Sequence, residues 1–154
     1  RSRSPGPGII MQSSLTYLVV FIGAGFGGAL RHGVNVASLR VFGSGFPFGT
    51  LTVNVVGSLS MGLLAGYFAL RSEAGQTWRL LLTTGVLGGF TTFSTFSFDT
   101  ALLYERGEIS IAVLYVALSV GAALVGLFAG LLSFDTSLEI GGLHALSPVP
   151  TSIS

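Results

Sequence analysis

Four long apolar stretches dominate the chain, and short polar segments separate them. The stretches lie at about residues 15–39, 48–70, 80–104 and 109–132. A helix that crosses a bilayer needs about 20 mainly apolar residues, and each stretch is long enough. The pattern therefore predicts an all-α membrane protein, with one domain of four transmembrane helices over residues 11–132.

The two ends of the chain do not continue this pattern. Residues 1–10 begin with the polar sequence RSRSPGPG and precede Met11, a plausible start just before the first apolar stretch. We expect residues 1–10 to be a disordered leader or an upstream remnant. Residues 133–154 contain Ser, Pro and Gly, and we expect a disordered tail to which we assign no function.

Composition supports the membrane assignment and narrows the possible chemistry. Of the 154 residues, 50% are hydrophobic and 8% are charged, whereas soluble domains contain about 25% charged residues. Four spans with short loops leave no room for a sizeable extramembrane domain, so the function must lie inside the membrane. The sequence contains no cysteine, which excludes disulfides, thiol catalysis and cysteine-bound metal.

The arginines are distributed evenly over the two sides of the predicted bundle. Arg71 and Arg79 flank the loop after the second span, whereas Arg40 and Arg106 lie at the opposite side, with Arg31 near the end of its helix. The positive-inside rule therefore has almost no asymmetry to act on. We infer that both orientations can insert, which would permit an antiparallel, dual-topology homodimer.

Small residues recur at the four-residue spacing that allows helix backbones to approach closely. Residues 23–28 read GAGFGG and satisfy the G-x-G-x-x-G pattern of dinucleotide-binding turns, but no strand precedes them and the first acidic residue is Glu73. We therefore interpret them as a helix-packing surface. The same spacing occurs in the second and fourth spans, at Ser58, Gly62 and Gly66 and at Ala122, Gly126 and Gly130.

The third apolar stretch is a poor helix near its middle. Residues 88–92 read GGFTT, with paired glycines followed by two β-branched threonines. Non-helical backbone is tolerated at membrane depth only where protein buries it or where it lines water. We predict a broken third helix, and carbonyl groups freed by such a break could bind a cation near a dimer axis.

Several polar or aromatic residues within the spans are candidates for a permeation pathway. Asn54 must find a hydrogen-bond partner, which is either another helix or a passing anion that accepts from its amide. Phe93 and Phe96 share one helical face, so they either pack in a core or present their positive ring edges to an anion. The remaining candidates are Ser94 and Thr95, whose hydroxyls follow the same helix, Tyr115 and Ser119 in the fourth span, and Arg31, which either faces the interior or extends to the interface.

Three runs, taken together, resemble the Fluc family of fluoride channels, also called CrcB proteins. They are GGALRH at residues 27–32, FPFGTLTVNVVG at 46–57 and GGFTTFSTFS at 88–97. The resemblance covers about residues 15–132 and implies a passive, fluoride-selective channel of the plasma membrane. It also implies an antiparallel homodimer in the lipid bilayer, with two pores that are each lined by both subunits and that export toxic fluoride across the membrane.

The resemblance also implies roles for individual residues. Asn54 matches the family's pore asparagine, Phe93 and Phe96 its pore phenylalanines, and Ser94 and Thr95 the polar track beside them. Tyr115 and Ser119 match a tyrosine and a serine of the fourth helix. Gly88 and Thr91 match positions whose backbone carbonyls surround a central structural sodium ion. Ala123 departs from the family, which often has a second hydroxyl there.

Other functions fit the sequence less well. A small dual-topology, proton-coupled multidrug exporter is the main alternative, but it needs an acidic residue within the bundle, and Asp99 and Glu105 lie towards the end of the third span. A purely structural membrane protein would leave Asn54 and the Thr/Ser/Phe run without a purpose. We expect no enzyme and no nucleic-acid partner, because no Ser/His/Asp set or metal-ligand pair occurs and the two histidines, His32 and His144, are far apart.

Overall fold

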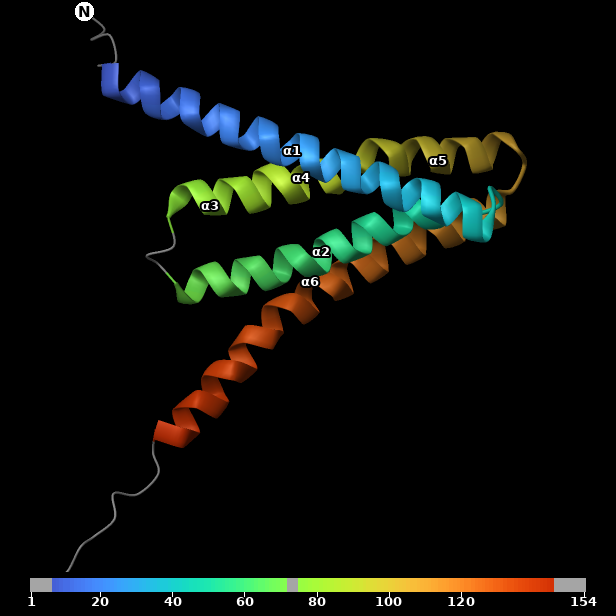
Figure 1. Ribbon diagram of the computed structural model, residues 1–154. Coiled ribbons are helices and arrows are strands. Elements are labelled where there is room, and N and C mark those ends of the chain that lie inside the picture. The colour runs from blue at the N-terminus through green and yellow to red at the C-terminus, as the bar shows by residue number, and fades with distance from the viewer. Residues whose placement is uncertain (1–6, 72–74, 146–154) are drawn as a thin grey trace, which may run out of the picture.

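The chain folds into an elongated bundle of helices (Figure 1). The computed structural model describes residues 7–71 and 75–145, and within them the side chains of residues 14–71 and 75–134. The elements in chain order are α1 (Pro7–Phe42), α2 (Phe48–Leu70), α3 (Gln76–Leu80), the π-helical segment η1 (Leu81–Leu87), α4 (Gly88–Phe90), α5 (Phe93–Glu105) and α6 (Ile109–Ala145).

Helices α2 and α6 lie side by side along the bundle, and α1 packs mainly against η1 and α4 (Figure 1). The chain turns sharply after α1, where Gly43 has φ +73°, and after α5, where Gly107 has φ +77°. Such positive φ values cost glycine little, because it has no Cβ atom. These two turns lie at the same end of the bundle, and α3 lies at the opposite end.

Within the described part of the chain, three helices are long and apolar enough to cross a membrane, namely Ser14–Phe42, Phe48–Leu70 and Ile109–Phe134. The protein is therefore all-helical and a multi-pass membrane protein, as predicted. The second helix has the predicted bounds. The first and fourth are longer than predicted: α1 begins at Pro7 and α6 ends at Ala145, within the segments expected to be leader and tail. The rest of those segments lies outside the described residues.

The remaining predicted span, residues 80–104, is divided among α3, η1, α4 and α5, so no single piece has the length of a span. Between α4 and α5, Thr91 (φ −79°, ψ 157°) and Thr92 (φ −155°, ψ 119°) have extended backbone. The chain thus leaves helical geometry for two residues and then resumes it at Phe93.

Glycines allow the helices to approach closely, as the small-residue spacing predicts. A Cβ atom added to Gly23 would lie 2.9 Å from the Cα atom of Gly85, and one added to Gly27 would meet the carbonyl of Val86. Within the GAGFGG run, Gly23 and Gly27 therefore form the surface on which α1 packs against the third segment. Between α2 and α6, a Cβ atom on Gly62 would meet the carbonyl of Leu127.

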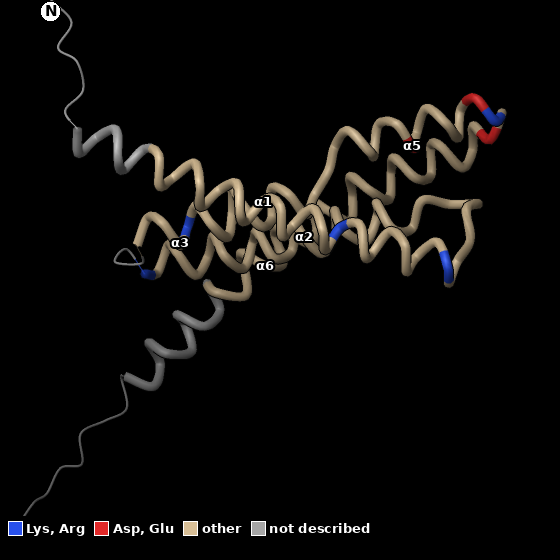
Figure 2. Tube along the Cα trace, turned by 45° about the horizontal axis from the view of Figure 1, so that its top comes forward, with Lys and Arg blue, Asp and Glu red and all other residues tan. Residues whose placement is uncertain are grey.

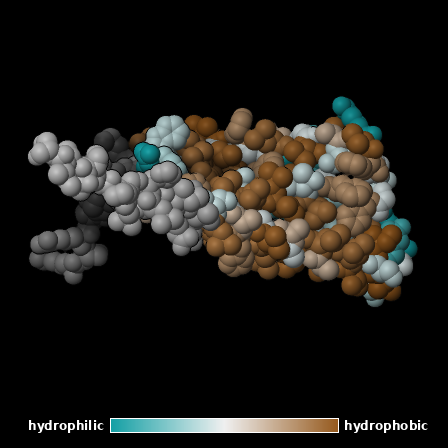
Figure 3. Space-filling view, turned by 90° about the horizontal axis from the view of Figure 1, so that it is seen from below, coloured by the Kyte–Doolittle hydropathy of each residue, from teal (hydrophilic) through white to brown (hydrophobic). Residues whose placement is uncertain are grey.

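The outer surface is largely apolar and the charges lie mostly at the ends of the bundle. One face is covered by hydrophobic side chains, with hydrophilic ones near its ends (Figure 3). Basic residues occur at both ends, and one lies near the middle (Figure 2). This pattern suits a bilayer, since the hydrocarbon core disfavours charge and the interfaces accept it.

Candidate functional site

The interruption between α4 and α5 is held by the side chain of Asn54 from α2. The Nδ2 atom of Asn54 donates to the carbonyl oxygen of Thr92 at 3.0 Å, and its Oδ1 atom accepts from the amide nitrogen of Thr92 at 2.8 Å. Of the two kinds of partner considered for this amide, the structure has one on another segment of the protein. The two bonds to Thr92 use one of the two N–H groups on Nδ2 of Asn54, and the amide has a second N–H.

The hydroxyl of Thr92 joins the polar side chains at the start of α5. Its Oγ1 atom accepts from the backbone N–H of Thr95 at 3.2 Å and donates to Oγ1 of Thr95 at 3.1 Å, and it lies 3.2 Å from Oγ of Ser94. Thr92 is thus the N-cap of α5. The hydroxyls of Ser94 and Thr95 both meet at this cap.

The two predicted carbonyl groups have lost their usual helical donors. In a continuous α-helix, the N–H of Thr92 would bond the carbonyl of Gly88, and the N–H of Thr95 would bond the carbonyl of Thr91. Here the first N–H donates to Asn54 and the second to the hydroxyl of Thr92. The carbonyls of Gly88 and Thr91 therefore lack these helical donors.

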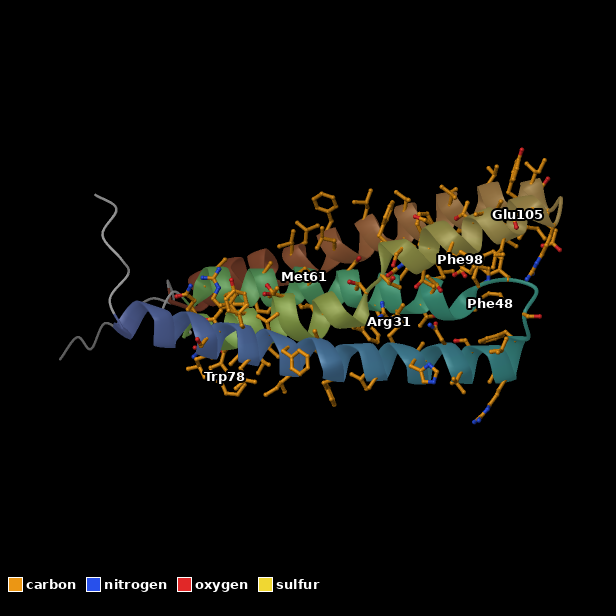
Figure 4. All side chains as sticks on the ribbon, turned by 90° about the horizontal axis from the view of Figure 1, so that it is seen from above. Arg31, Phe48, Met61, Trp78, Phe98 and Glu105 are labelled. Atoms are coloured by element: carbon orange, nitrogen blue, oxygen red, sulfur yellow. The ribbon has the colours of Figure 1, made fainter. Side chains whose placement is uncertain are left out.

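Arg31 points into the bundle from α1, beside the interruption (Figure 4). Its Nη1 atom lies 3.4 Å from the carbonyl oxygen of Thr91, a long hydrogen bond. Of the two orientations considered for this side chain, the structure has the interior one. A fixed positive charge thus lies near the centre of the bundle.

The two phenylalanines share a face but differ in their surroundings. Their ring centroids are 5.5 Å apart, with Phe93 78% exposed and Phe96 9% exposed. Phe96 packs against the fully buried ring of Tyr115 at 5.4 Å, and Tyr115 in turn meets Phe46 edge-on at 5.5 Å. The aromatic residues form a row that leads from the surface at Phe93 into the core.

An open cavity of about 390 Å³ brings together four of the predicted pore residues, Asn54, Phe93, Phe96 and Ser119. Ser119 is 4% exposed, and among the described residues its Oγ atom has no hydrogen-bond partner. Thr91, Thr92 and Ala123 also contribute to the walls, as does Met61 on α2 (Figure 4). The hydroxyl of Ser119 is therefore buried and available to a ligand in this cavity.

Another side of α5 lines a second cavity of about 270 Å³. Thr95 lines it together with Asn35, Thr50, Asp99 and Arg106. The hydroxyl of Tyr115 donates to Oδ2 of Asp99 at a distance of 3.4 Å. Thr95 and Asp99 thus line the second cavity and not the first, and Ser94 lines neither cavity.

The prediction from sequence omits three residues of this region. It treats Thr92 only as a helix breaker, although threonine is a favoured residue at the N-cap of a helix. It considers Asp99 only for its place near the end of the span, and the contact of Asp99 with Tyr115 requires tertiary structure. Thr50, 4% exposed in the second cavity, carries no distinctive sequence signal.

Comparison with known proteins identifies relatives over most of the chain. Residues 18–131 match the CrcB-like protein family, described as camphor resistance (CrcB). The chain is 62% identical over 117 residues to the fluoride-specific ion channel FluC 2 of Nitrobacter hamburgensis, which covers 76% of this chain and 94% of that protein. It is 61% identical over 117 residues to the fluoride-specific ion channel FluC of Methylobacterium nodulans, with the same coverage.

Proposed function

Because this chain belongs to the CrcB (Fluc) family, we propose that it is a passive, fluoride-selective channel that exports fluoride across the cell membrane. Relatives that are 50–62% identical are named as fluoride-specific ion channels. The observation that carries the proposal for this chain is the cavity that joins Asn54, Phe93, Phe96 and Ser119.

The cavity offers the kind of donors that fluoride requires. Fluoride is small and strongly hydrated, so a selective pore must replace its water with hydrogen-bond donors at close range. Ser119 supplies a buried hydroxyl without another partner among the described residues, and Asn54 supplies its second N–H. The ring edges of Phe93 and Phe96 carry positive partial charge and would add weak, fast-exchanging contacts.

The remaining polar residues would continue the pathway beyond Phe96. Ser94 and Thr95 lie at the start of α5, and the second cavity extends from Thr95 past Asp99. Arg31 would attract anions towards the middle of the membrane. The proposed route therefore runs along α5 from the exposed ring of Phe93 to the end of the bundle that holds Arg106.

We further propose that two copies of the chain form an antiparallel homodimer with two pores, each lined by both subunits. Phe93 is 78% exposed on the single subunit, although it lines the proposed pore. A second subunit would cover this ring and close the cavity. In this assembly, α3, η1, α4 and α5 together would make the interrupted third span.

The carbonyls of Gly88 and Thr91 fit a structural sodium ion at the dimer centre, since both have lost their helical donors. When bound, the ion would supply positive charge that holds carbonyl groups of two subunits together. Arg31 would share the carbonyl of Thr91 with it. We propose this site as a structural one.

Fluoride efflux from liposomes that contain the purified protein tests the proposed function. A potassium ionophore removes the opposing voltage, and a fluoride-selective electrode reads the external concentration. Rapid efflux that depends on the ionophore, with chloride retained, is expected. Absence of efflux from vesicles that hold folded dimer, together with proton-coupled uptake of an organic cation, would instead favour the multidrug exporter.

A further inference from the structure

Helix α2 presents two residues to the interruption, one turn apart. Asn54 bonds both polar atoms of the Thr92 backbone, at 3.0 and 2.8 Å. Gly57 is buried, and a Cβ atom added to it would fall on Cγ2 of Thr91 and 3.4 Å from Cδ1 of Phe90. The missing side chain of Gly57 therefore leaves the space in which Thr91 lies.

The hydrogen bonds locate the point at which the helix stops. Both the N–H and the hydroxyl of Thr91 bond the carbonyl of Leu87, each at 2.9 Å, so helical bonding reaches Thr91. The next N–H, that of Thr92, bonds Asn54 instead of Gly88. The switch from intrahelical to interhelical bonding thus occurs at the residue that Asn54 contacts.

We propose that Asn54 and Gly57 form a socket on α2 that fixes where the third segment is interrupted. Asn54 is then a positioning residue for the Gly88 and Thr91 carbonyls and for Phe93, in addition to its place in the cavity. The effect of the socket on fluoride flux rests on the proposed function, because the socket would set the position of pore residues through the backbone. The contact between α2 and the interruption does not itself depend on fluoride.

A role for Asn54 as a pore donor alone leads to a different expectation. Its replacement would then reduce fluoride flux but leave the backbone of residues 88–95 unchanged. Hydrogen–deuterium exchange of the dimer in lipid nanodiscs separates the two, since the amide of Thr92 is protected only while Asn54 accepts from it.

In Asn54→Ala, we expect peptides that cover residues 88–95 to exchange about tenfold faster, since two hydrogen bonds are lost. The matched control is Ser119→Ala, which removes a hydroxyl from the same cavity but touches no backbone bond. It should leave exchange at residues 88–95 unchanged. Equal exchange in Asn54→Ala and the natural protein would overturn the socket.

The Gly57 contact is tested by compensation. Gly57→Ala should speed exchange at residues 88–95 and reduce flux at least tenfold, because its Cβ atom displaces Thr91. Thr91→Ser removes the Cγ2 methyl group and keeps the hydroxyl bond to Leu87. Adding Thr91→Ser to Gly57→Ala should restore both readouts, and a double variant no better than Gly57→Ala would contradict the contact.

These readouts distinguish the socket from the proposed function. If the natural protein passes no fluoride but Asn54→Ala still loses protection, the socket stands and the channel function fails. If fluoride flux is robust and protection is unaffected by either α2 variant, the channel function stands and the socket fails.

Discussion

Phe93 and Phe96 have different surroundings, which separates their roles in stability from their roles in conduction. Phe93 is 78% exposed on the subunit, whereas Phe96 is 9% exposed and packs on Tyr115. Isoleucine preserves apolar bulk but lacks the ring quadrupole. Replacing each phenylalanine with isoleucine therefore tests the ring edges at one exposed and one buried position.

We predict that Phe93→Ile and Phe96→Ile each reduce fluoride flux about tenfold or more, while the dimer still assembles. Within the subunit, Phe96→Ile should also lower the free energy of unfolding, by about 1–2 kcal/mol, because it leaves space beside Tyr115. Liposome efflux and thermal unfolding in detergent measure the two effects. Full flux in both variants would mean that the rings only pack.

The cap at Thr92 depends on a single oxygen atom. Thr92→Val keeps the β-branched shape but removes the acceptor for the N–H of Thr95, at a cost of about 1 kcal/mol. We predict a lower thermal midpoint and reduced flux for Thr92→Val. Thr92→Ser, which retains the hydroxyl, should behave like the natural protein, and equal losses in both would argue against the cap.

The close packing of α2 against α6 supports the helices that carry the site. A Cβ atom on Gly62 would meet the carbonyl of Leu127 and lie 3.1 Å from the Cα atom of Gly130. We predict that Gly62→Ala destabilises the subunit by about 1–3 kcal/mol, through overpacking between two backbones. Thermal unfolding measures this change.

Gly121→Ala is the control on the same pair of helices. A Cβ atom at Gly121 has nothing within 4 Å in the subunit, and alanine favours helix over glycine by about 1 kcal/mol. We expect Gly121→Ala to leave the thermal midpoint unchanged or slightly raised. If the thermal midpoint of Gly121→Ala were as low as that of Gly62→Ala, overpacking between α2 and α6 would not explain the effect of Gly62→Ala.

At the scale of the whole molecule, the basic residues are shared between the two ends of the bundle. Arg71 and Arg79 lie at the end with α3, where their guanidinium groups rest over the rings of Tyr67 and Phe68. Arg40 and Arg106 belong to the other end, at the turns after α1 and α5. Small additions of charge should therefore decide the orientation in the membrane.

We predict that a double variant with added lysines at one end of the bundle, Gly45→Lys with Glu105→Lys, inserts in one orientation. A double variant at the other end, Gly75→Lys with Gln76→Lys, should insert in the opposite orientation. All four positions are exposed. Each double variant alone should give little flux, whereas co-expression of the two should restore it. Cysteine tagging of the loops reports the orientation, and full flux from either oriented variant alone would contradict an antiparallel dimer.

Much of the architecture could be predicted from the sequence, because the bilayer imposes it locally. Helix length, apolar composition and the small-residue spacing each depend on residues close in the chain, and the second helix and the glycine contacts agree with the prediction. The candidates Asn54 and Ser119 are also visible in the sequence, since a polar side chain within an apolar span is costly unless it finds a partner or lines a pathway.

The tertiary structure alone decided how these residues divide and connect. Which cavity each hydroxyl lines depends on how the helices pack. The bonds of Asn54 to the backbone of Thr92 join residues that are 38 positions apart in the chain. The sequence determined that the third segment would make a poor helix. Where its hydrogen bonds stop was decided by α2, because a backbone group inside a membrane must find a partner, and Asn54 provides it at Thr92.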